Sequence, residues 1–101
     1  MRRAVATVAA ALALGGCSLG GPGPNATGEE IYVQLCARCH GMDLEGRVGP
    51  ALGPGSNAAL EGREYIEFTI ANGRGRMPSF SLDDDQLARL VDYVRKVQED
   101  E

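Results

Sequence analysis

The residues best suited to chemistry lie in one short stretch, Cys36-Ala37-Arg38-Cys39-His40. Two thiols three residues apart on a helix project from one face, and an imidazole follows directly. Three kinds of site use such residues. They are a redox dithiol, part of a zinc site, and the attachment point of a haem, whose vinyl groups bond to the two cysteines and whose iron takes the histidine.

The two sites without haem find little support elsewhere in the chain. A structural zinc site uses four ligands, and residues 18–101 offer no cysteine or histidine besides Cys36, Cys39 and His40. A thioredoxin-like dithiol lies in a βαβ unit, whereas this chain shows no convincing strand pattern. We therefore interpret the stretch as the attachment site of one covalently bound haem c, with Cys36 and Cys39 as thioether positions and His40 as the proximal iron ligand.

A second iron ligand would have to be a methionine, because the chain contains one histidine. Met1 belongs to the amino-terminal leader described below, and Met42 is tethered two residues from His40. Met77 lies in a glycine-rich stretch, and Pro78 favours an extended backbone for it. A Met/His ligand pair raises the haem potential in cytochromes. We expect Met77 to be the distal ligand; the alternative is simple packing in the core, which is what most methionines do.

The first predicted helix places the cysteines and the histidine together. Thr27 and Glu30 form a capping-box pattern at its start. Gly41 is suited to end it, because glycine adopts a left-handed conformation without strain. Apolar residues recur at four-residue spacing along it, at Ile31, Leu35 and Cys39. We therefore expect both thiols and His40 at the last turn of this helix.

Two further helices are predicted downstream. One covers residues 63–71 and stops at residues 72–73, Asn-Gly. The other begins after Ser81, which forms a second capping-box pattern with Asp84. Its apolar stripe consists of Leu87, Leu90, Val91 and Val94. Three helices and no strand predict an all-α domain.

Residues 41–60 join the first two helices and contain five glycines and two prolines. Such a long stretch without regular structure is unusual in a small domain, and three short helices have little core of their own. A haem would supply a large apolar disc for the chain to pack around. We expect a largely unfolded protein without haem, and packing on the haem by Ile31, Leu35, Leu52, Ile66, Ile70 and Phe80.

The amino-terminal segment has the pattern of a signal peptide. Arg2 and Arg3 precede an apolar run over residues 4–14, which is too short to span a bilayer. Residues 14–17, Leu-Gly-Gly-Cys, resemble the lipobox of bacterial lipoproteins, in which the cysteine is lipidated and begins the mature protein. This interpretation explains the odd number of cysteines. The alternatives are a free thiol at Cys17 and an uncleaved membrane anchor.

Three regions follow from these patterns. Residues 1–16 are the predicted signal peptide, residues 17–26 the lipidated cysteine with a flexible Gly/Pro-rich linker, and residues 27–101 the folded domain. Loss of two arginines with the signal peptide leaves eight of ten basic residues against fourteen acidic ones, so the net charge changes from −4 to −6. The composition lacks the clustered positive charge of a nucleic-acid surface and favours partners with basic patches.

Over residues 27–97 the chain resembles the class I c-type cytochromes, of the small bacterial lipoprotein kind. The matching marks are Gly28, Tyr32, Cys36-Ala37-Arg38-Cys39-His40-Gly41, Gly49-Pro50, Met77-Pro78, Leu90 and Tyr93. The resemblance implies a small cytochrome c fold, with three main helices around one covalently attached haem. It also implies that the Pro50 carbonyl orients His40 through its other ring nitrogen. The first and last helices would cross closely, with Gly28 and Tyr32 against Leu90 and Tyr93.

The resemblance further implies an electron-transfer protein and not an enzyme. Expected partners are a membrane quinol-oxidising donor and a terminal oxidase or reductase as acceptor. The protein would be a monomer, lipid-anchored at the outer face of a plasma membrane or in a periplasm. Two alternatives stay open: a haem sensor or small haem enzyme with a displaceable sixth ligand, and a fixed subunit of an oxidase or reductase complex. Arg47, Arg74 and Arg76 are interpreted as solvated charges, with pairing to a haem propionate as the alternative.

Overall fold

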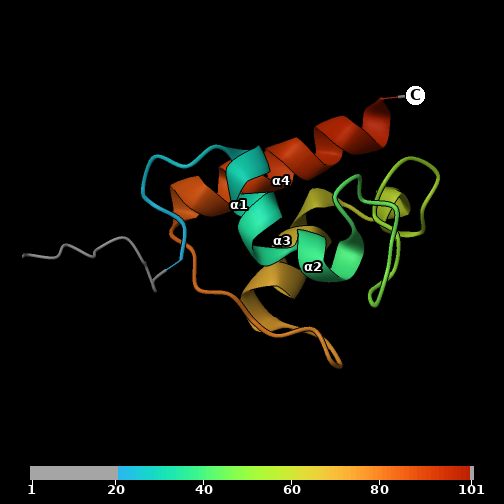
Figure 1. Cartoon of the computed structure of the whole chain (residues 1–101), viewed down its shortest axis with the longest axis horizontal. Coiled ribbons are helices and arrows are strands. Elements are labelled where there is room, and N and C mark those ends of the chain that lie inside the picture. The colour runs from blue at the N-terminus through green and yellow to red at the C-terminus, as the bar shows by residue number, and fades with distance from the viewer. Residues whose placement is uncertain (1–20, 101) are drawn as a thin grey trace, which may run out of the picture.

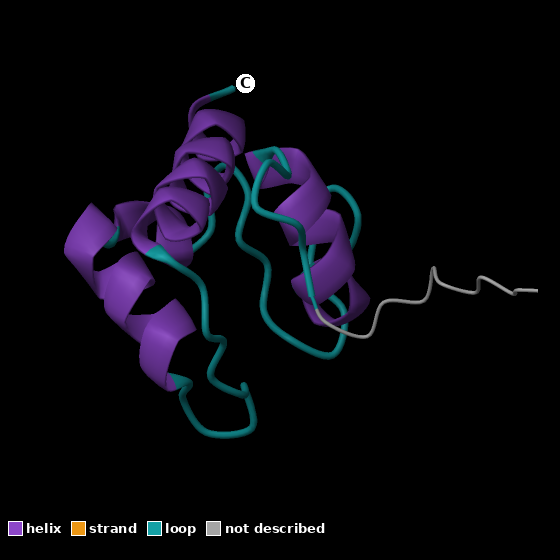
Figure 2. Ribbon diagram, turned by 90° about the vertical axis from the view of Figure 1, so that its left-hand side faces the viewer, coloured by secondary structure: helices purple, strands orange, loops and turns teal. Residues whose placement is uncertain are grey.

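The computed structural model describes residues 21–100, and Figure 1 shows their arrangement. The elements are α1 (Gly28–Leu35), α2 (Ala37–His40), a short 3-10 helix η1 (Ala58–Leu60), α3 (Arg63–Asn72) and α4 (Asp84–Glu99). Loops connect the helices (Figure 2), and the β pairing within the described residues is one isolated bridge between Arg74 and Met77. The prediction of an all-α fold is confirmed. The expected signal peptide and Cys17 lie outside the described residues.

The start of α1 agrees with the predicted capping box. The Thr27 hydroxyl accepts a hydrogen bond from the Glu30 N–H at 3.0 Å, and the Glu30 carboxylate accepts one from the Thr27 N–H at 2.8 Å. Each bond satisfies a backbone donor that the first turn of a helix leaves without a partner. The start of α1 is therefore the one that the capping-box pattern predicted.

The end of the first helix differs from the prediction, because the chain bends at Cys36. There φ is −116°, α1 ends one residue earlier, and α2 carries the rest of the cysteine motif as far as Gly41, whose φ is +91°. The bend accompanies a buried hydrogen bond from the Tyr32 hydroxyl to the Gly41 carbonyl, at 2.6 Å. Nine residues of straight helix would separate these two by about 13 Å along the axis, too far for the bond to form.

The start of α4 also differs from the prediction. The N-cap is Asp83, whose carboxylate accepts a hydrogen bond from the Gln86 N–H at 2.8 Å, and the Gln86 side chain accepts one from the Asp83 N–H at 3.0 Å. The expected box of Ser81 with Asp84 is therefore wrong. α3 exceeds its predicted range by one residue and ends at Gly73, with φ +79°.

The segment before α1 is docked on α4, contrary to the expectation of a flexible linker up to residue 26. Gln86 Nε2 donates to the carbonyls of Pro22 (3.3 Å) and Gly23 (3.1 Å). Arg89 donates through Nε to the Ala26 carbonyl and through Nη2 to the Pro24 carbonyl, both at 2.8 Å. The side chains of proline and glycine cannot form hydrogen bonds, but the backbone carbonyls of these residues are strong acceptors. Residues 22–26 therefore form an amino-terminal arm fixed to the folded domain.

The main core lies where α1 crosses α4 (Figure 1). A Cβ atom on Gly28 would overlap the Arg89 carbonyl and lie 2.9 Å from the Tyr93 Cβ, so only glycine permits this close approach. The rings of Tyr32 and Tyr93 pack with centroids 5.7 Å apart. The crossing expected from the resemblance is present. The largest fully buried side chains within residues 21–100 are Ile31, Tyr32, Leu44, Leu90 and Val91.

Residues 41–60 fold back on α2 through backbone hydrogen bonds. The N–H of Gly46 donates to the His40 carbonyl and that of Gly49 to the Cys39 carbonyl, both at 2.7 Å. Leu44 is fully buried and accepts from Leu52 at 2.9 Å. The loop thus has a defined path beside the cysteine motif, although its regular structure is limited to η1. No helix within residues 21–100 combines the length and apolar character needed to cross a membrane.

Candidate cofactor site

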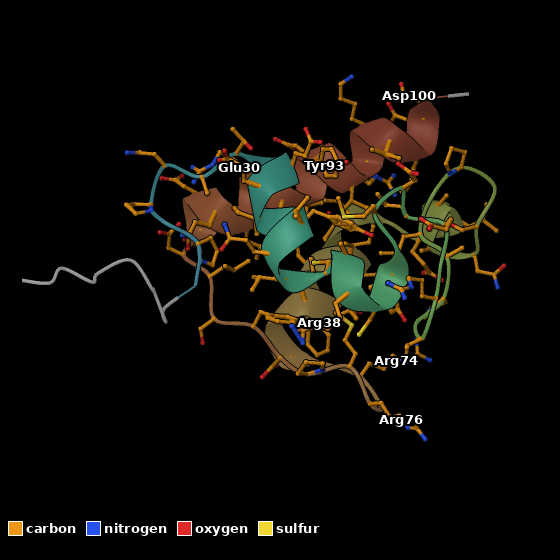
Figure 3. The ribbon with its side chains drawn as sticks, viewed as in Figure 1. Glu30, Arg38, Arg74, Arg76, Tyr93 and Asp100 are labelled. Atoms are coloured by element: carbon orange, nitrogen blue, oxygen red, sulfur yellow. The ribbon has the colours of Figure 1, made fainter. Side chains whose placement is uncertain are left out.

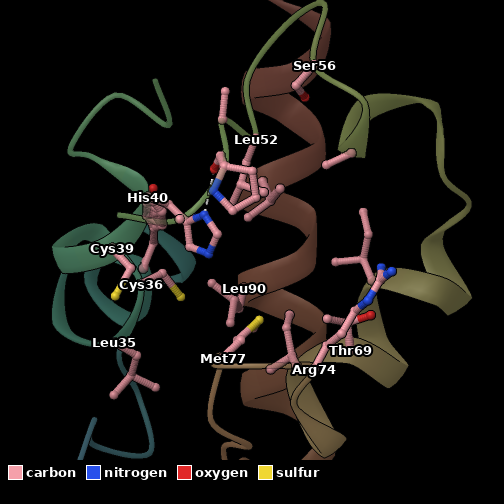
Figure 4. Close-up of a pocket in the computed structure, with 18 of the residues that line it drawn as sticks. Leu35, Cys36, Cys39, His40, Leu52, Ser56, Thr69, Arg74, Met77 and Leu90 are labelled. Carbon is pink, nitrogen blue, oxygen red and sulfur yellow. Dashed lines mark hydrogen bonds between the residues drawn. The ribbon is translucent and has the colours of Figure 1, made fainter. Parts of the chain in front are cut away.

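A cavity of about 1080 Å³ separates α2 and its following loop from α3, the Met77 loop and α4 (Figure 4). Closely packed protein interiors leave few voids larger than a water molecule, and ligand pockets reach about 300–1,000 Å³. The apolar part of the lining includes Leu35, Leu52, Ile66, Ile70, Phe80, Leu90 and Val94. This lining suits a large, flat, apolar group.

His40 is buried and held in one orientation inside the cavity. Its Nδ1 lies 2.8 Å from the Pro50 carbonyl oxygen. A carbonyl can only accept, so Nδ1 carries the proton and Nε2 keeps a lone pair for a metal. Gly49 allows this arrangement, because a Cβ there would lie 2.9 Å from the imidazole Cε1. The hydrogen bond implied by the resemblance is present, and Gly49 has a steric role that the sequence did not reveal.

Both cysteines of the motif line the same cavity, and Figure 4 shows their sulfur atoms at one side of it. They are not joined in a disulfide. Burial, and then the proximity of Cys39, raise the pKa of the Cys36 thiol to about 12. Zinc sites and reactive dithiols need thiolates, which this environment disfavours. A thioether is uncharged, so burial does not oppose it.

Met77 lies in a loop that presents its side chain to the cavity (Figure 4). The loop is held by hydrogen bonds between Arg74 and Met77, at 2.9 and 3.0 Å, and from the Phe80 N–H to the Ile70 carbonyl at 2.9 Å. Gly73 permits the tight turn, since a Cβ there would lie 2.6 Å from the Met77 carbonyl. Met42, by contrast, is 60% exposed and does not line the cavity.

Of the apolar side chains expected to pack on a haem, all but Ile31 line the cavity. Ile31 is instead fully buried in the core cluster that includes Leu90 and Val91 of α4. Arg74 and Arg76 line the cavity, whereas Arg47 does not. Arg38 also lines the cavity, although no role was expected for it from the sequence. Its position within the motif was the available signal.

The residues that converge here fit a haem c. The apolar walls suit the porphyrin, and two neutral thiols at one side suit its vinyl groups. An oriented imidazole and a thioether sulfur enter from different elements, and both are ligands that iron accepts in cytochromes. Within the described residues no group of three or more histidine, cysteine or carboxylate side chains could hold a metal ion.

Comparison with known proteins agrees with this geometry. Residues 23–94 match the family model described as cytochrome C oxidase, cbb3-type, subunit III. The chain is 43% identical to cytochrome c-551 of Bacillus subtilis (strain 168), over 66% of this chain and 58% of that one. It is 36% identical to cytochrome c55X of Stutzerimonas stutzeri, over 68% of this chain and 64% of that one.

Solved structures give the same result. Cytochrome cL from Hyphomicrobium denitrificans is similar with a TM-score of 0.64 and 33% identity, over 70% of this chain and 45% of that one. The c-type cytochrome NirC is similar with a TM-score of 0.58 and 34% identity, over 68% and 85%. The chain spans 58% to 64% of the length of three curated relatives that it matches. These matches and the cavity together show that the chain belongs to the class I c-type cytochromes and carries one covalently bound haem c.

Proposed function

We propose that this cytochrome is a one-electron carrier whose iron is held by His40 and Met77. The observation that carries the proposal is that the cavity receives one iron-binding side chain from the α2 side and another from the Met77 loop. When bound, haem c supplies an iron that alternates between Fe(III) and Fe(II). With both axial positions filled by protein, no position would remain for a substrate, which distinguishes a carrier from a haem enzyme or sensor.

The chain's own residues tune and protect the site in this proposal. The Pro50 carbonyl fixes the tautomer of His40 and makes Nε2 a better donor. The sulfur of Met77 favours the reduced iron and so raises the potential. The apolar walls limit the access of water, which lowers the reorganisation that accompanies each electron transfer. Cys36 and Cys39 would anchor the group by thioether bonds.

Membrane attachment is a second part of the proposal. Residues 1–16 would be removed as a signal peptide and Cys17 lipidated, placing the domain outside the cytoplasm at a membrane surface. Because the arm is fixed to the folded domain from Pro22 onward, a lipid at Cys17 would hold the domain close to the membrane surface. A membrane quinol-oxidising donor and an oxidase or reductase acceptor would then be within reach.

A fixed oxidase subunit is a second candidate function, favoured by the description of the matching family model. Purification from membranes in mild detergent separates the two cases. A mobile carrier elutes alone as a monomer, whereas a subunit elutes with a large complex. In the same preparation, labelled fatty acid should be incorporated into the wild type and not into Cys17→Ala.

Absorption spectra with and without carbon monoxide test the ligand assignment. We expect the spectrum of the reduced wild type not to change when carbon monoxide is added. The oxidised form should show the weak long-wavelength band of sulfur-ligated haem. Met77→Leu should lose that band, bind carbon monoxide and have a lower midpoint potential. Met42→Leu, at the exposed methionine, is the matched control and should behave as the wild type. A wild-type protein that binds carbon monoxide readily would favour a sensor or enzyme.

A further inference from the structure

Arg63, the first residue of α3, joins that helix to α4 through hydrogen bonds of its side chain. Its Nη1 donates to the Asp92 carboxylate at 2.7 Å, and its Nη2 donates to the Ala88 carbonyl at 3.3 Å. Within α3, its Nε donates to the Glu67 carboxylate at 2.9 Å, which orients the guanidinium. One arginine can serve all three acceptors because its donors form a rigid planar fork.

The loop that carries Met77 is fixed to α3. The Arg74 side chain in this loop donates a hydrogen bond to the Tyr65 hydroxyl of α3. The backbone N–H of Phe80 forms the second link, to the last turns of the same helix. We call residues 63–80 the Met77 lobe. A movement of α3 relative to α4 would therefore carry Met77 with it.

Arg63 supplies the polar links between the Met77 lobe and the rest of the fold. Within residues 21–100, the other hydrogen bonds of the lobe are internal or go to Gly62, the residue that precedes it. Among the helices, α3 packs mainly on α4, and it buries a single residue, Ile70. The attachment of the lobe to the protein thus combines apolar contacts with one arginine.

This link is distant from the methionine. Figure 3 shows Arg74 and Arg76, which lie close to Met77 in the sequence, on the opposite side of the molecule from Tyr93 of α4. Both ion pairs of Arg63 are at least one-third exposed, and pairs of this kind contribute little to global stability. A local opening costs less free energy than unfolding, so a weak link can still determine how often the lobe opens.

We propose that Arg63 is a positioning residue for Met77, which keeps the methionine sulfur at the iron by holding the Met77 lobe on α4. The proposal rests on the carrier function above, in which Met77 is the distal ligand. It identifies a residue that controls this ligation although it does not line the cavity. When the link is broken, the open state of the lobe should be more populated, and an external ligand could then reach the iron.

Binding of imidazole to the oxidised holoprotein measures the open population. Imidazole is mostly uncharged at pH 8, and it can take the distal position only when Met77 has left it. Its apparent dissociation constant equals the intrinsic constant divided by the fraction of open protein. We expect the apparent constant to fall roughly three- to tenfold in Arg63→Gln, because loss of charge-assisted hydrogen bonds raises the open fraction.

Substitutions of the partner and of the ionic strength test whether the link itself is responsible. Asp92→Asn should lower the constant by a similar factor, and the double variant should show no larger change. Asp92→Asn also replaces Arg63→Gln in each test if that variant does not accumulate. Arg63→Lys should be intermediate, since an ammonium group lacks the fork geometry. In 1 M salt, where the screening length is about 3 Å, the wild type should bind imidazole more tightly, whereas Arg63→Gln should not.

Arg89→Gln is the matched control. Arg89 also donates to two acceptors from a guanidinium, but these acceptors belong to the amino-terminal arm, so the imidazole constant should not change. Hydrogen exchange adds a readout that does not involve the iron. In Arg63→Gln the Phe80 amide should exchange faster, while the Cys36 amide, which donates to the Tyr32 carbonyl, should keep its protection.

Three outcomes would overturn the proposal. One is an imidazole constant in Arg63→Gln equal to that of the wild type. Another is an equal decrease in Arg89→Gln, which would indicate a general loss of stability. The third is an equal increase of exchange at Phe80 and Cys36. Failure of the carrier function is a separate result, because a wild type without the band of sulfur-ligated haem lacks Met77 ligation, whereas the Phe80 amide still reports whether Arg63 holds the lobe.

Discussion

The α1–α4 crossing and the cavity side of the molecule are stabilised in different ways. At the crossing, Ile31, Tyr32, Leu90 and Val91 have no exposed surface. Burial of each such side chain contributes about 1.5–3 kcal/mol. On the cavity side, α3 buries a single residue, Ile70, and the loops expose apolar side chains to a large space.

The difference shows that only at the α1–α4 crossing do protein side chains alone form a closely packed core. The crossing has a close glycine contact, an aromatic pair and an arm fixed by side-chain hydrogen bonds. The cavity side consists of apolar walls whose contacts are completed by the haem. We therefore expect changes on the two sides to have separable effects, one on the folding of the helix pair and one on the cofactor.

Removal of the haem should have the largest effect. Protein produced without haem attachment should lose cooperative melting, because a small domain with so large an apolar cavity cannot offset its conformational entropy. Calorimetry and circular dichroism would measure this loss, and hydrogen exchange should find any remaining protection in α1 and α4. If the haem-free protein melted cooperatively near the melting temperature of the holoprotein, the cavity side would not depend on the haem for its stability.

Gly28→Val should be the most damaging single substitution at the crossing. Its Cβ would overlap the Arg89 carbonyl, and backbone atoms cannot move aside as a side-chain end can. We expect a loss of at least about 3 kcal/mol in the free energy of unfolding. Gly23→Ala is the control, since no atom lies within 4 Å of its added Cβ. Chemical denaturation of the two holoproteins would compare them.

Arg89→Ala should release the amino-terminal arm and leave the haem spectrum unchanged. The side chain donates one part-buried and one exposed hydrogen bond to carbonyls of the arm. A hydrogen bond from a charged donor contributes about 1.5–3 kcal/mol and an exposed one less, because water replaces the partner, so we expect a loss of about 2 kcal/mol. Faster hydrogen exchange at the Ala26 amide is the specific readout. Lys96→Ala, at an exposed position of the same helix, should leave that amide protected.

Tyr32→Phe should have a smaller effect that depends on pH. It leaves the buried Gly41 carbonyl without its partner at 2.6 Å and should cost about 1 kcal/mol near neutral pH. Burial, followed by nearby negative charge, raises the pKa of Tyr32 above its usual 10.0. The folded state therefore favours the neutral phenol, and its contribution is complete below pH 10 and lost as the pH rises further.

Denaturation at several pH values would isolate this contribution. The wild type should lose stability above pH 10 more steeply than Tyr32→Phe does. The pKa of Tyr93 is also raised by burial, so Tyr93→Phe serves as the comparison with a half-buried ring. Equal slopes for the wild type and Tyr32→Phe would show that the buried phenol does not titrate with unfolding.

The site was largely predictable because its chemistry is local in sequence. The C-x-x-C-H spacing places two thiols and an imidazole together on two adjoining helical turns, whatever the rest of the fold. The scarcity of other ligand residues left Met77 as the one candidate for the opposite position. Thr27 and Glu30 predicted the start of α1 for the same reason, since a capping box involves only four consecutive residues.

Most of the errors have the opposite cause, because they depended on contacts between distant segments; the start of α4 is the exception, since Asp83 and Gln86 form a local capping box next to the expected one. The bend at Cys36 goes together with a hydrogen bond between Tyr32 and Gly41. The amino-terminal arm is held in place by hydrogen bonds from Gln86 and Arg89, which lie more than sixty residues further along the chain. Ile31 fits the apolar spacing of the cysteine motif, but it lies in α1, and its side chain is buried in the core cluster with Leu90 and Val91 of α4. Periodicity identifies an apolar face without saying what covers it.

By itself the sequence determined the cofactor, the all-α class, the ligand set proposed for the iron and the order of the helices, because short-range spacing and composition specify each of these. Only the tertiary structure decided where charge lies relative to the cavity. Net charge is a sum over residues and has no direction. Folding brings Arg38, Arg74 and Arg76 to one rim and leaves the carboxylates of α1 and α4 on other surfaces, so an acidic chain presents a basic face beside its haem site.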